Sequence, residues 1–437
     1  MRIRRSAIGL FLFAILGANI QFTSANAAIL GSGTPCEVIV SSSSNLTYSH
    51  NAGTRECTYT FAYNAVARTI TLPTNLVSAT IKLTGARGGQ GGPRYNASAA
   101  GAFRMWTYSS TSTHVGEYSG TIPSASSKQI EINTGNIGSN GQFFTCDANS
   151  HAGGLGGSSS YALGIGGQGG SQGCGIQASG EAGGTGGGGG GATVAVIDSL
   201  QIFAGGGGGT GGTGRNEWDN ANLAGGAAVS TNISNYVSGS NSGASGGIVS
   251  QTSNTGCTSN IGGGGGGGGG FNGGNGGNAG YHKCSTHDAT AAGGGYPGLN
   301  GMTYFLTSTT SSYVERSTAT TDSTAYGSAI IVLKYKGTTT ATLSLPTGNF
   351  VYRQATIISD TSTVAGKITF RVNGKVLPGC KNKVARADVV VTCSYRPSTR
   401  NAVTITATLD PTSSEFIGTV SVSAQFQVAN RTGPRVR

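Results

Sequence analysis

Residues 183–197 read Gly-Gly-Thr-Gly-Gly-Gly-Gly-Gly-Gly-Ala-Thr-Val-Ala-Val-Ile, so a nearly pure glycine run passes directly into a β-branched run. Two interpretations of such tracts compete. Gly/Ser-rich tracts are commonly flexible linkers. Alternatively, extended helices with three residues per turn pack together and exchange backbone hydrogen bonds, because glycine leaves the backbone bare. The apolar runs at 192–197 and 200–204 favour the ordered interpretation, because a flexible linker has no use for them.

The glycines are concentrated in one part of the chain. Of the 78 glycines, 53 lie within residues 151–300. Many follow a Gly-Gly-X pattern, which would leave bare backbone on two faces of such a helix and carry a side chain on the third. So much glycine argues against a helix-rich protein, and the 10 prolines are too few for collagen. Pure runs interrupt the pattern at Gly186–Gly191, Gly205–Gly209 and Gly262–Gly270.

Segments with period-two alternation flank the glycine-rich part. The segments at 58–61, 68–72, 77–83 and 329–335 predict half-buried strands. Residues 118–122 and 129–132 predict a hairpin around Pro123. We therefore predict an all-β protein in which residues 28–337 form a glycine-rich β domain, a β-sandwich with an inserted polyglycine-II-like helix bundle.

Residues 338–437 have a different character, with few glycines and many Thr, Val and Ile residues. The segment 366–372 ends in Asn373-Gly374, which is a strong hairpin signal. Further β-rich runs follow at 389–395 and 402–407. Short strands separated by turns over a domain of this length predict a second β-sandwich, followed by a short basic tail.

Residues 1–27 have the pattern of a secretory signal peptide. Met1–Arg5 is basic, residues 7–18 are apolar, and Ala25-Asn26-Ala27 is a small-x-small cleavage site. The apolar run is shorter than the ~20 residues that span a bilayer, and no later segment is apolar enough to do so. We therefore predict a secreted or cell-surface protein without a transmembrane segment after signal cleavage.

The eight cysteines of an exported chain predict disulfides. Eight cysteines allow 105 connectivities. A metal site is the alternative, since His282, Cys284, His287 and Asp288 cluster, but no Cys-x-x-Cys occurs. We expect no metal and no cofactor, and Cys380–Cys393 should staple a local hairpin. Proximity along the chain predicts the pairs Cys36–Cys57, Cys146–Cys174, Cys257–Cys284 and Cys380–Cys393.

The net charge of +11 is unevenly distributed. Arg2, Arg4 and Arg5 contribute +3, residues 6–340 are neutral, and residues 341–437 carry +8. A leader that implies export makes nucleic acid an improbable partner. The basic C-terminal domain instead predicts attraction to an anionic cell-envelope polymer.

Aromatic and arginine side chains gather at two places beside the glycine runs. Such residues are typical anchors of binding surfaces, although these rings could instead cover the bundle or fill the adjoining sandwich. The candidate binding residues are Tyr95, Phe103, Trp106, Tyr108, Arg215 and Trp218.

No catalytic arrangement is evident. Gly243-Ala244-Ser245-Gly246-Gly247 fits the Gly-x-Ser-x-Gly nucleophile pattern, but that pattern needs a strand-to-helix turn. The five histidines have no evident acid or nucleophile partner. We therefore expect a protein that is not an enzyme.

Two parts of the sequence resemble known families. Thr69–Leu72, Pro73, Val77–Leu83 and the run 85–89 resemble the opening of bacterial secreted glycine-rich domains, with Arg87 in place of a glycine, and residues 327–332 resemble their closing strand. The arrangement is similar to the glycine-rich extracellular region of the anaplastic lymphoma kinase and leukocyte tyrosine kinase receptors, and to phage tail-tip adhesins. The resemblance implies packed polyglycine helices and a region that binds a partner. Residues 366–374, 404–407 and 416–419 resemble bacterial immunoglobulin-like (Ig-like) domains, which are mostly stalks or spacers.

These features predict an adhesion or interaction protein whose glycine-rich scaffold presents binding loops on an Ig-like spacer. A stiff scaffold would bind by preorganisation, because the loops are already ordered. The expected partner is an extracellular glycan or protein ligand. The alternative is a self-assembling structural component of an extracellular matrix or surface layer.

Overall fold

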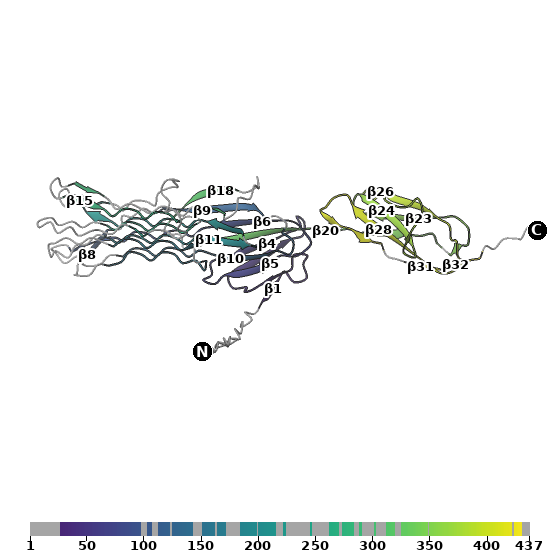
Figure 1. Cartoon of the computed structure of the whole chain (residues 1–437), viewed down its shortest axis with the longest axis horizontal. Coiled ribbons are helices and arrows are strands. Elements are labelled where there is room, and N and C mark those ends of the chain that lie inside the picture. Colours follow the sequence, from purple (N-terminus) through teal and green to yellow (C-terminus); the bar gives the residue numbers. More distant parts are fainter. Residues whose placement is uncertain are drawn as a thin grey trace, which may run out of the picture.

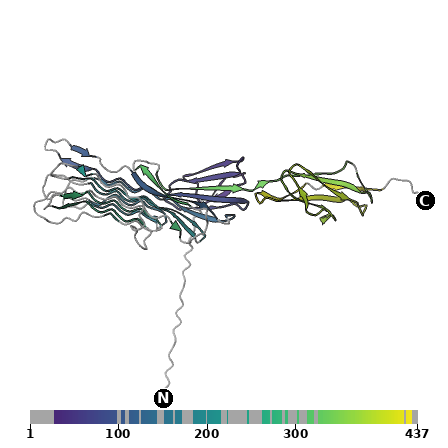
Figure 2. The same ribbon diagram turned by 90° about the horizontal axis from the view of Figure 1, so that it is seen from above.

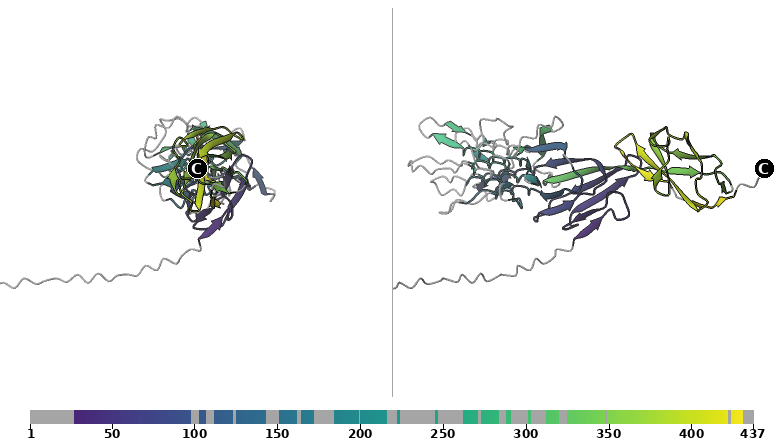
Figure 3. Two further views of the ribbon diagram at one scale, coloured as in Figure 1. Left: turned by 90° about the vertical axis from the view of Figure 1, so that its right-hand side faces the viewer. Right: turned by 45° about the vertical axis from the view of Figure 1, so that its right-hand side comes forward.

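The computed structural model describes residues 27–97, 103–106, 112–122, 125–142, 151–161, 164–171, 184–198, 200–215, 222–223, 245–246, 262–270, 273–283, 288–290, 301–302, 312–319, 325–347, 349–421 and 424–430. The predicted signal peptide lies outside these ranges except for Ala27. Over the described residues the chain is all-β, and it contains no helix long and apolar enough to cross a membrane. The molecule is elongated, and its two bodies follow one another along one axis (Figure 1, Figure 3).

Two open antiparallel sheets face one another in the first body, which we call the first sandwich. The seven-stranded sheet has the order β1 (Ala28–Leu30), β2 (Val38–Val40), β5 (Arg68–Thr71), β10 (Gln129–Asn133), β11 (Thr193–Ile197), β12 (Leu200–Ala204) and β17 (Gly301–Met302). The six-stranded sheet has the order β18 (Ser312–Ala319), β9 (Ser112–Thr121), β6 (Leu76–Thr84), β19 (Ser328–Tyr335), β4 (Glu56–Phe61) and β3 (Leu46–Asn51).

The core of the first sandwich follows from the period-two alternation of its strands. In β4 and β19 every second residue is buried, so one face of each strand turns toward the other sheet. Buried residues from both sheets form a single hydrophobic cluster, which includes Val38, Ile70, Ile130, Tyr59, Phe61, Ile81 and Ile331. The predicted hairpin around Pro123 was wrong, because β9 and β10 belong to different sheets.

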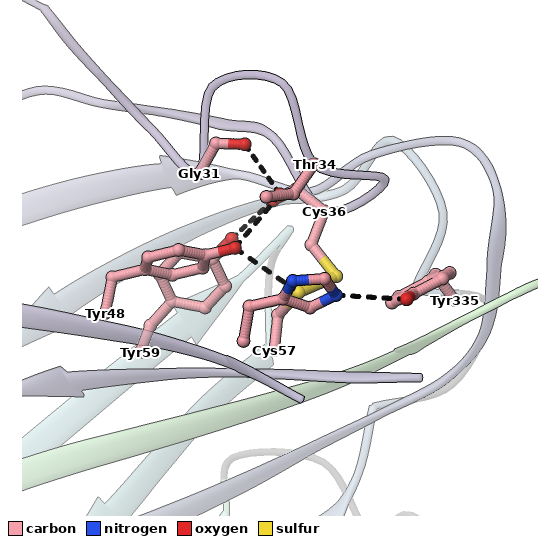
Figure 4. Close-up of a disulfide and its surroundings, with 8 residues drawn as sticks. Gly31, Thr34, Cys36, Tyr48, Cys57, Tyr59 and Tyr335 are labelled. Carbon is pink, nitrogen blue, oxygen red and sulfur yellow. Dashed lines mark hydrogen bonds between the residues drawn. A yellow bond between two sulfur atoms is a disulfide. The ribbon is translucent and has the colours of Figure 1, made fainter. Parts of the chain in front are cut away.

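A disulfide between Cys36 and Cys57 crosses the first sandwich (Figure 4). Cys57 lies on β4 of the six-stranded sheet, while Cys36 lies two residues before β2 of the seven-stranded sheet. The Tyr59 hydroxyl donates a hydrogen bond to the carbonyl of Cys36, and burial raises the pKa of Tyr59 well above its ordinary value. This predicted pair therefore ties the two sheets together.

Glycine-rich extended segments continue from the first sandwich, and they run side by side without strand pairing over most of their length (Figure 2). The central segment, residues 184–192, has six neighbouring segments. Its amides donate to three of them in rotation, and every third amide reaches the same neighbour. Positions 184, 187 and 190 donate to 207–213; positions 185, 188 and 191 donate to 136–142; positions 186, 189 and 192 donate to 164–170. The other three neighbours, 86–92, 154–157 and 263–269, donate back to its carbonyls.

The close approach of these six neighbouring segments explains why every residue of Gly186–Gly191 is glycine. A Cβ added at any of these positions would lie less than 3.0 Å from a backbone oxygen of a neighbouring segment, a separation that real Cβ atoms do not show. The segment 85–92 has fewer neighbours and is less restricted. There, Arg87 and Gln90 lie three residues apart, and the Arg87 amide donates at 3.0 Å to the carbonyl of Ala325, which lies outside the glycine segments.

Threonine hydroxyls replace some backbone hydrogen bonds between these segments. The buried Thr210 Oγ1 accepts a hydrogen bond from the amide of Gly91 at 2.6 Å. Thr185 Oγ1 accepts one from the amide of Gln142 at 2.8 Å. A β-branched residue is therefore accommodated where its hydroxyl takes the role of a carbonyl acceptor.

The second sandwich begins after β19 and packs around its own hydrophobic cluster, which includes Phe350, Ile358, Phe370, Tyr395 and Ile405. One sheet has the order β21 (Ala341–Ser344), β23 (Thr356–Ser362) and β27 (Val390–Tyr395). The other contains β24 (Gly366–Val372), β25 (Lys375–Val376), β26 (Lys383–Ala385), β28 (Val403–Pro411), β30 (Thr419–Val420) and β31 (Ala424–Phe426). Two short parallel pairs join β20 (Gly337–Thr338) to β29 (Phe416–Ile417) and β22 (Phe350–Val351) to β32 (Val428–Ala429).

The predicted Asn373-Gly374 hairpin is confirmed. Val372 of β24 pairs with Lys375 of β25, and both turn residues have positive φ, 47° and 78°. The predicted local staple was wrong, although the pair Cys380–Cys393 itself is present. The carbonyl of Cys380 accepts from the amide of Phe370 on β24, whereas Cys393 lies on β27 of the facing sheet. The disulfide crosses this sandwich as well, because the chain changes sheets between β26 and β27.

Glu415 of the second sandwich connects the two bodies. Its carboxylate pairs with Arg55 Nη2 at 2.5 Å and Lys334 Nζ at 3.1 Å, and its carbonyl accepts from the Gly337 amide at 2.8 Å. The Arg55 guanidinium also lies over the ring of Phe416, 4.9 Å from its centroid. Hydrogen bonds from Lys334 and Arg55 hold the pKa of Glu415 below its ordinary value. These contacts fix the second sandwich at the end of β19.

Candidate binding surface

Three short hairpins start from one end of the glycine segments, and we call them the tip hairpins. β7 (Arg94–Ala97) and β8 (Phe103–Trp106) follow the segment 85–92, and β13 (Gly214–Arg215) and β14 (Asn222–Leu223) follow 205–213. β15 (Tyr281–Lys283) and β16 (Asp288–Thr290) follow 273–280. β8 and β15 lie at the end of the molecule that is farthest from the second sandwich (Figure 1).

Backbone hydrogen bonds bring the starts of the three hairpins together. The Thr213 amide donates to the Gly92 carbonyl at 3.1 Å, one residue before β13 and two before β7. The Gly212 amide donates to the Gly263 carbonyl, and the Gly280 amide donates to the neighbouring Gly262 carbonyl. The glycine segments therefore deliver three separate stretches of sequence to one surface, which we call the tip.

Four of the six candidate binding residues belong to these hairpins. Tyr95 pairs with Met105, Phe103 with Ala97, and Trp106 with Arg94 in the β7–β8 hairpin. Arg215 pairs with Asn222 in the β13–β14 hairpin. Tyr108 and Trp218 lie outside the described residues. The backbone thus gathers two stretches that are more than a hundred residues apart in sequence.

The proposed metal-ligand cluster falls partly on the third tip hairpin. His282 and Lys283 lie on β15, and Lys283 pairs with Asp288 of β16. Cys284 and His287 lie outside the described residues, as do Cys146, Cys174 and Cys257, so the two disulfides predicted from these cysteines stay predictions. Within the described ranges no group of three His, Cys, Asp or Glu residues could hold a metal ion.

Two surface hollows are lined by residues that lie outside the tip hairpins. One, of about 340 Å³, is on the glycine segments and is lined by residues that include Asn140, Gln142 and Gln168. The other, of about 380 Å³, lies beside the first sandwich, where Tyr63 and Tyr326 stack with ring centroids 5.0 Å apart. Sequence reasoning missed this pair, because the two tyrosines come from opposite ends of the first sandwich's sequence.

The titratable groups with unusual surroundings are scattered. Asp360 is fully buried; its Oδ2 accepts a hydrogen bond from Ser421 Oγ at 2.6 Å, and burial raises its pKa. In the first sandwich, His50 Nε2 on β3 lies 3.0 Å from Tyr335 Oη on β19. A Ser-His-Asp mechanism needs its three groups in contact, and these groups are not. Ser245 lies in an extended stretch beside Gly276, whose added Cβ would meet its carbonyl.

No known protein-family model matches the chain, and no curated protein matches it.

Proposed function

We propose that the protein is a secreted or cell-surface adhesion or interaction protein, in which a rigid glycine scaffold presents the tip hairpins to a partner. The observation that carries the proposal is the central segment 184–192, whose amides all donate to surrounding segments. Two of its six neighbouring segments, 86–92 and 207–213, lead into tip hairpins, and the third hairpin follows 273–280, which is hydrogen-bonded to the neighbouring run 262–268. A scaffold that is already ordered spares the cost of ordering the loops when the partner binds.

The glycine segments in this proposal are polyglycine-II helices. A three-residue repeat is the period of such a helix, and the amides of 184–192 change neighbour with that same period. At ~3.1 Å per residue, a nine-residue segment would extend about 28 Å, enough to hold the tip clear of the first sandwich. The Gly-Gly-X pattern would then leave bare backbone on two faces of each helix and carry a side chain on the third.

The second sandwich in this proposal is an Ig-like spacer. Its two facing sheets, the Asn373-Gly374 hairpin and the cross-sheet disulfide support that assignment. The contacts of Glu415 with Arg55, Lys334 and Gly337 support a fixed orientation between spacer and scaffold. Secretion is supported by the disulfides, which persist mainly in oxidising compartments.

A self-assembling matrix or surface-layer component is the alternative. One observation favours it: β1 is the edge strand of its sheet, and Ile29 on β1 and its partner Ile39 on β2 are 58% and 53% exposed. An exposed apolar edge can pair with a second copy of the chain.

A variant in which Tyr95, Phe103 and Trp106 are all replaced by serine tests the proposal. On an array of bacterial and animal glycans and on whole cells, this tip variant should lose at least about tenfold in apparent affinity, because buried aromatic anchors carry most of a binding energy. The matched control replaces Tyr63 and Tyr326 by serine, which removes aromatic rings away from the tip. Equal binding by the tip variant and the natural chain would refute the proposal. Polymerisation of the purified chain without binding to cells or glycans would support the alternative.

A further inference from the structure

Two arginines share the ring of one tyrosine at the far end of the second sandwich, and a third is hydrogen-bonded to the backbone beside it. The guanidinium carbon of Arg353 lies 5.2 Å from the centroid of the Tyr352 ring, and that of Arg400 lies 5.1 Å from it. Arg396 Nε donates to the carbonyl of Arg353 at 2.6 Å. We call Arg353, Arg396 and Arg400 the arginine cluster. Two guanidinium groups therefore share one ring, and the third is attached to the same turn.

Backbone hydrogen bonds hold the segments that carry these side chains. The Tyr352 amide donates to the carbonyl of Ala429 on β32, and the Arg353 amide donates to the carbonyl of Pro397, each at 3.0 Å. β32 lies at the end of the second sandwich that is remote from the first (Figure 1). The arginine cluster and the tip are therefore at opposite ends of the molecule.

The arginine cluster has no carboxylate partner among the described residues. The second sandwich has four acidic residues. Asp360 is buried against Ser421 and Glu415 pairs with Arg55 and Lys334, while Asp388 and Asp410 form no ion pair with the arginine cluster within the described part of the chain. All three arginines are exposed. Like charges repel when they are held close together, so a cluster without a counter-charge is suited to an anion supplied from outside.

The backbone of Arg353 strengthens this argument. Arg353 has φ +60°, a conformation that favours glycine. Among the described residues one other arginine, Arg55, has a positive φ, and its side chain holds Glu415. Observed backbone outliers of this kind tend to occur where the side chain has a role. Arg353 has the same conformation and no carboxylate to hold.

We propose that the arginine cluster binds an anionic polymer of a cell envelope through its carboxylate or phosphate groups. Guanidinium groups suit this ligand, because they form paired hydrogen bonds to both kinds of oxyanion. This proposal rests on the proposed function, which places the protein outside the cell. The arginine cluster would be the point at which the basic second sandwich attaches to the envelope. The tip would then face away from the envelope.

The test compares two variants of the full chain that lose the same charge. The first carries Arg353→Gly, Arg396→Gln and Arg400→Gln; glycine suits the backbone at 353, so this change relieves the turn. The control carries Lys367→Gln, Lys375→Gln and Lys381→Gln, three exposed lysines of the same sandwich. Binding is measured to polygalacturonate, which carries carboxylates, to a glycerol-phosphate teichoic acid, which carries phosphates, and to neutral dextran. Thermal melting verifies that both variants fold.

The expected result is binding of the natural chain to one or both anionic polymers and not to dextran. The arginine variant should lose about tenfold or more in affinity, and the control about threefold or less, because loss of paired hydrogen bonds exceeds loss of diffuse charge. Equal losses in both variants, or no binding to either polymer, would overturn the proposal. Stronger binding to duplex DNA than to both polymers would also overturn it. The tip variant should keep its affinity for the polymers, so failure at the tip and failure at the arginine cluster are distinguishable.

Discussion

Alanine at Gly188 should destabilise the glycine scaffold by about 3 kcal/mol or more. The added Cβ would meet the carbonyl groups of Leu155 and Gly154, both backbone, at less than 3.0 Å. Neither carbonyl can move independently, because residues 154–157 donate hydrogen bonds to the same central segment. One methyl group therefore forces segments apart, and their hydrogen bonds lengthen together. Thermal melting followed by circular dichroism, together with limited proteolysis, measures the loss.

Gly53→Ala is the matched control for this substitution. Gly53 lies in an exposed turn, and an added Cβ there would have only the flexible Asn51 side chain near it, at 3.3 Å. Its φ is not in the positive range that favours glycine. We expect a change within about 0.5 kcal/mol, as for most surface substitutions. Similar stabilities for the Gly188 and Gly53 variants would contradict close packing of the segments.

Alanine at Arg68 should cost about 4 kcal/mol. Arg68 is among the largest fully buried side chains of the described residues and lies at the start of β5. Its Nη1 donates to the carbonyls of Ser44 and Asn45 at 2.8 and 3.0 Å, and its Nη2 donates to the carbonyl of Ala62 at 2.5 Å. These acceptors adjoin β3 and β4 of the facing sheet, so alanine leaves a cavity and removes the side-chain donor of three carbonyls. The carbonyls of Ser44 and Ala62 are then unpaired, whereas that of Asn45 still accepts from the Ala62 amide at 2.9 Å. Chemical denaturation of the full chain measures the change.

Arg68→Met separates the two contributions. Methionine restores most of the volume but donates no hydrogen bonds. Burial lowers the pKa of Arg68 to about 10, which indicates that burying the charge is itself unfavourable. Methionine should therefore cost about 2 kcal/mol, less than alanine. A methionine variant as unstable as the alanine variant would assign the whole effect to the hydrogen bonds, and two variants of natural stability would contradict the structural role of Arg68.

The strands of the first sandwich were largely predictable, because their alternation is a local property of the sequence. The predicted strand at 329–335 corresponds to β19, and that at 58–61 lies within β4. The pairing of strands was less predictable. Residues 118–122 and 129–132 looked like a hairpin, yet they fall in different sheets, because alternation indicates that one face is buried and not which sheet covers it.

The same limit applies to the disulfides. Proximity in sequence identified Cys36–Cys57 and Cys380–Cys393, but not that both cross between sheets. Arg68 looked like an ordinary strand residue, because the neighbouring sequence does not indicate the three carbonyls that accept hydrogen bonds from it. The contact of Arg55 with Glu415 spans 360 positions of sequence and carries no local signal at all.

The tip was predictable only in part. The aromatic residues near 95–106 and Arg215 stood out by composition, whereas their convergence depends on backbone hydrogen bonds between glycine segments. Composition alone does not explain why Gly186–Gly191 contains glycine only. The run Gly186–Gly191 marks a segment enclosed by others, and a non-glycine residue occurs inside the enclosure where its side chain has a place there, as at the buried Thr185, whose hydroxyl accepts from the Gln142 amide.

Amide hydrogen exchange at Gly186–Gly191 is the most direct test of an ordered glycine scaffold. Nitrogen-labelled glycine allows these amides to be followed by nuclear magnetic resonance, with the amides of β19 as the internal reference. The account predicts exchange at least about a thousandfold slower than in an unstructured peptide, equivalent to a local opening free energy of about 4 kcal/mol. Exchange at the rate of an unstructured peptide, while β19 stays protected, would contradict it.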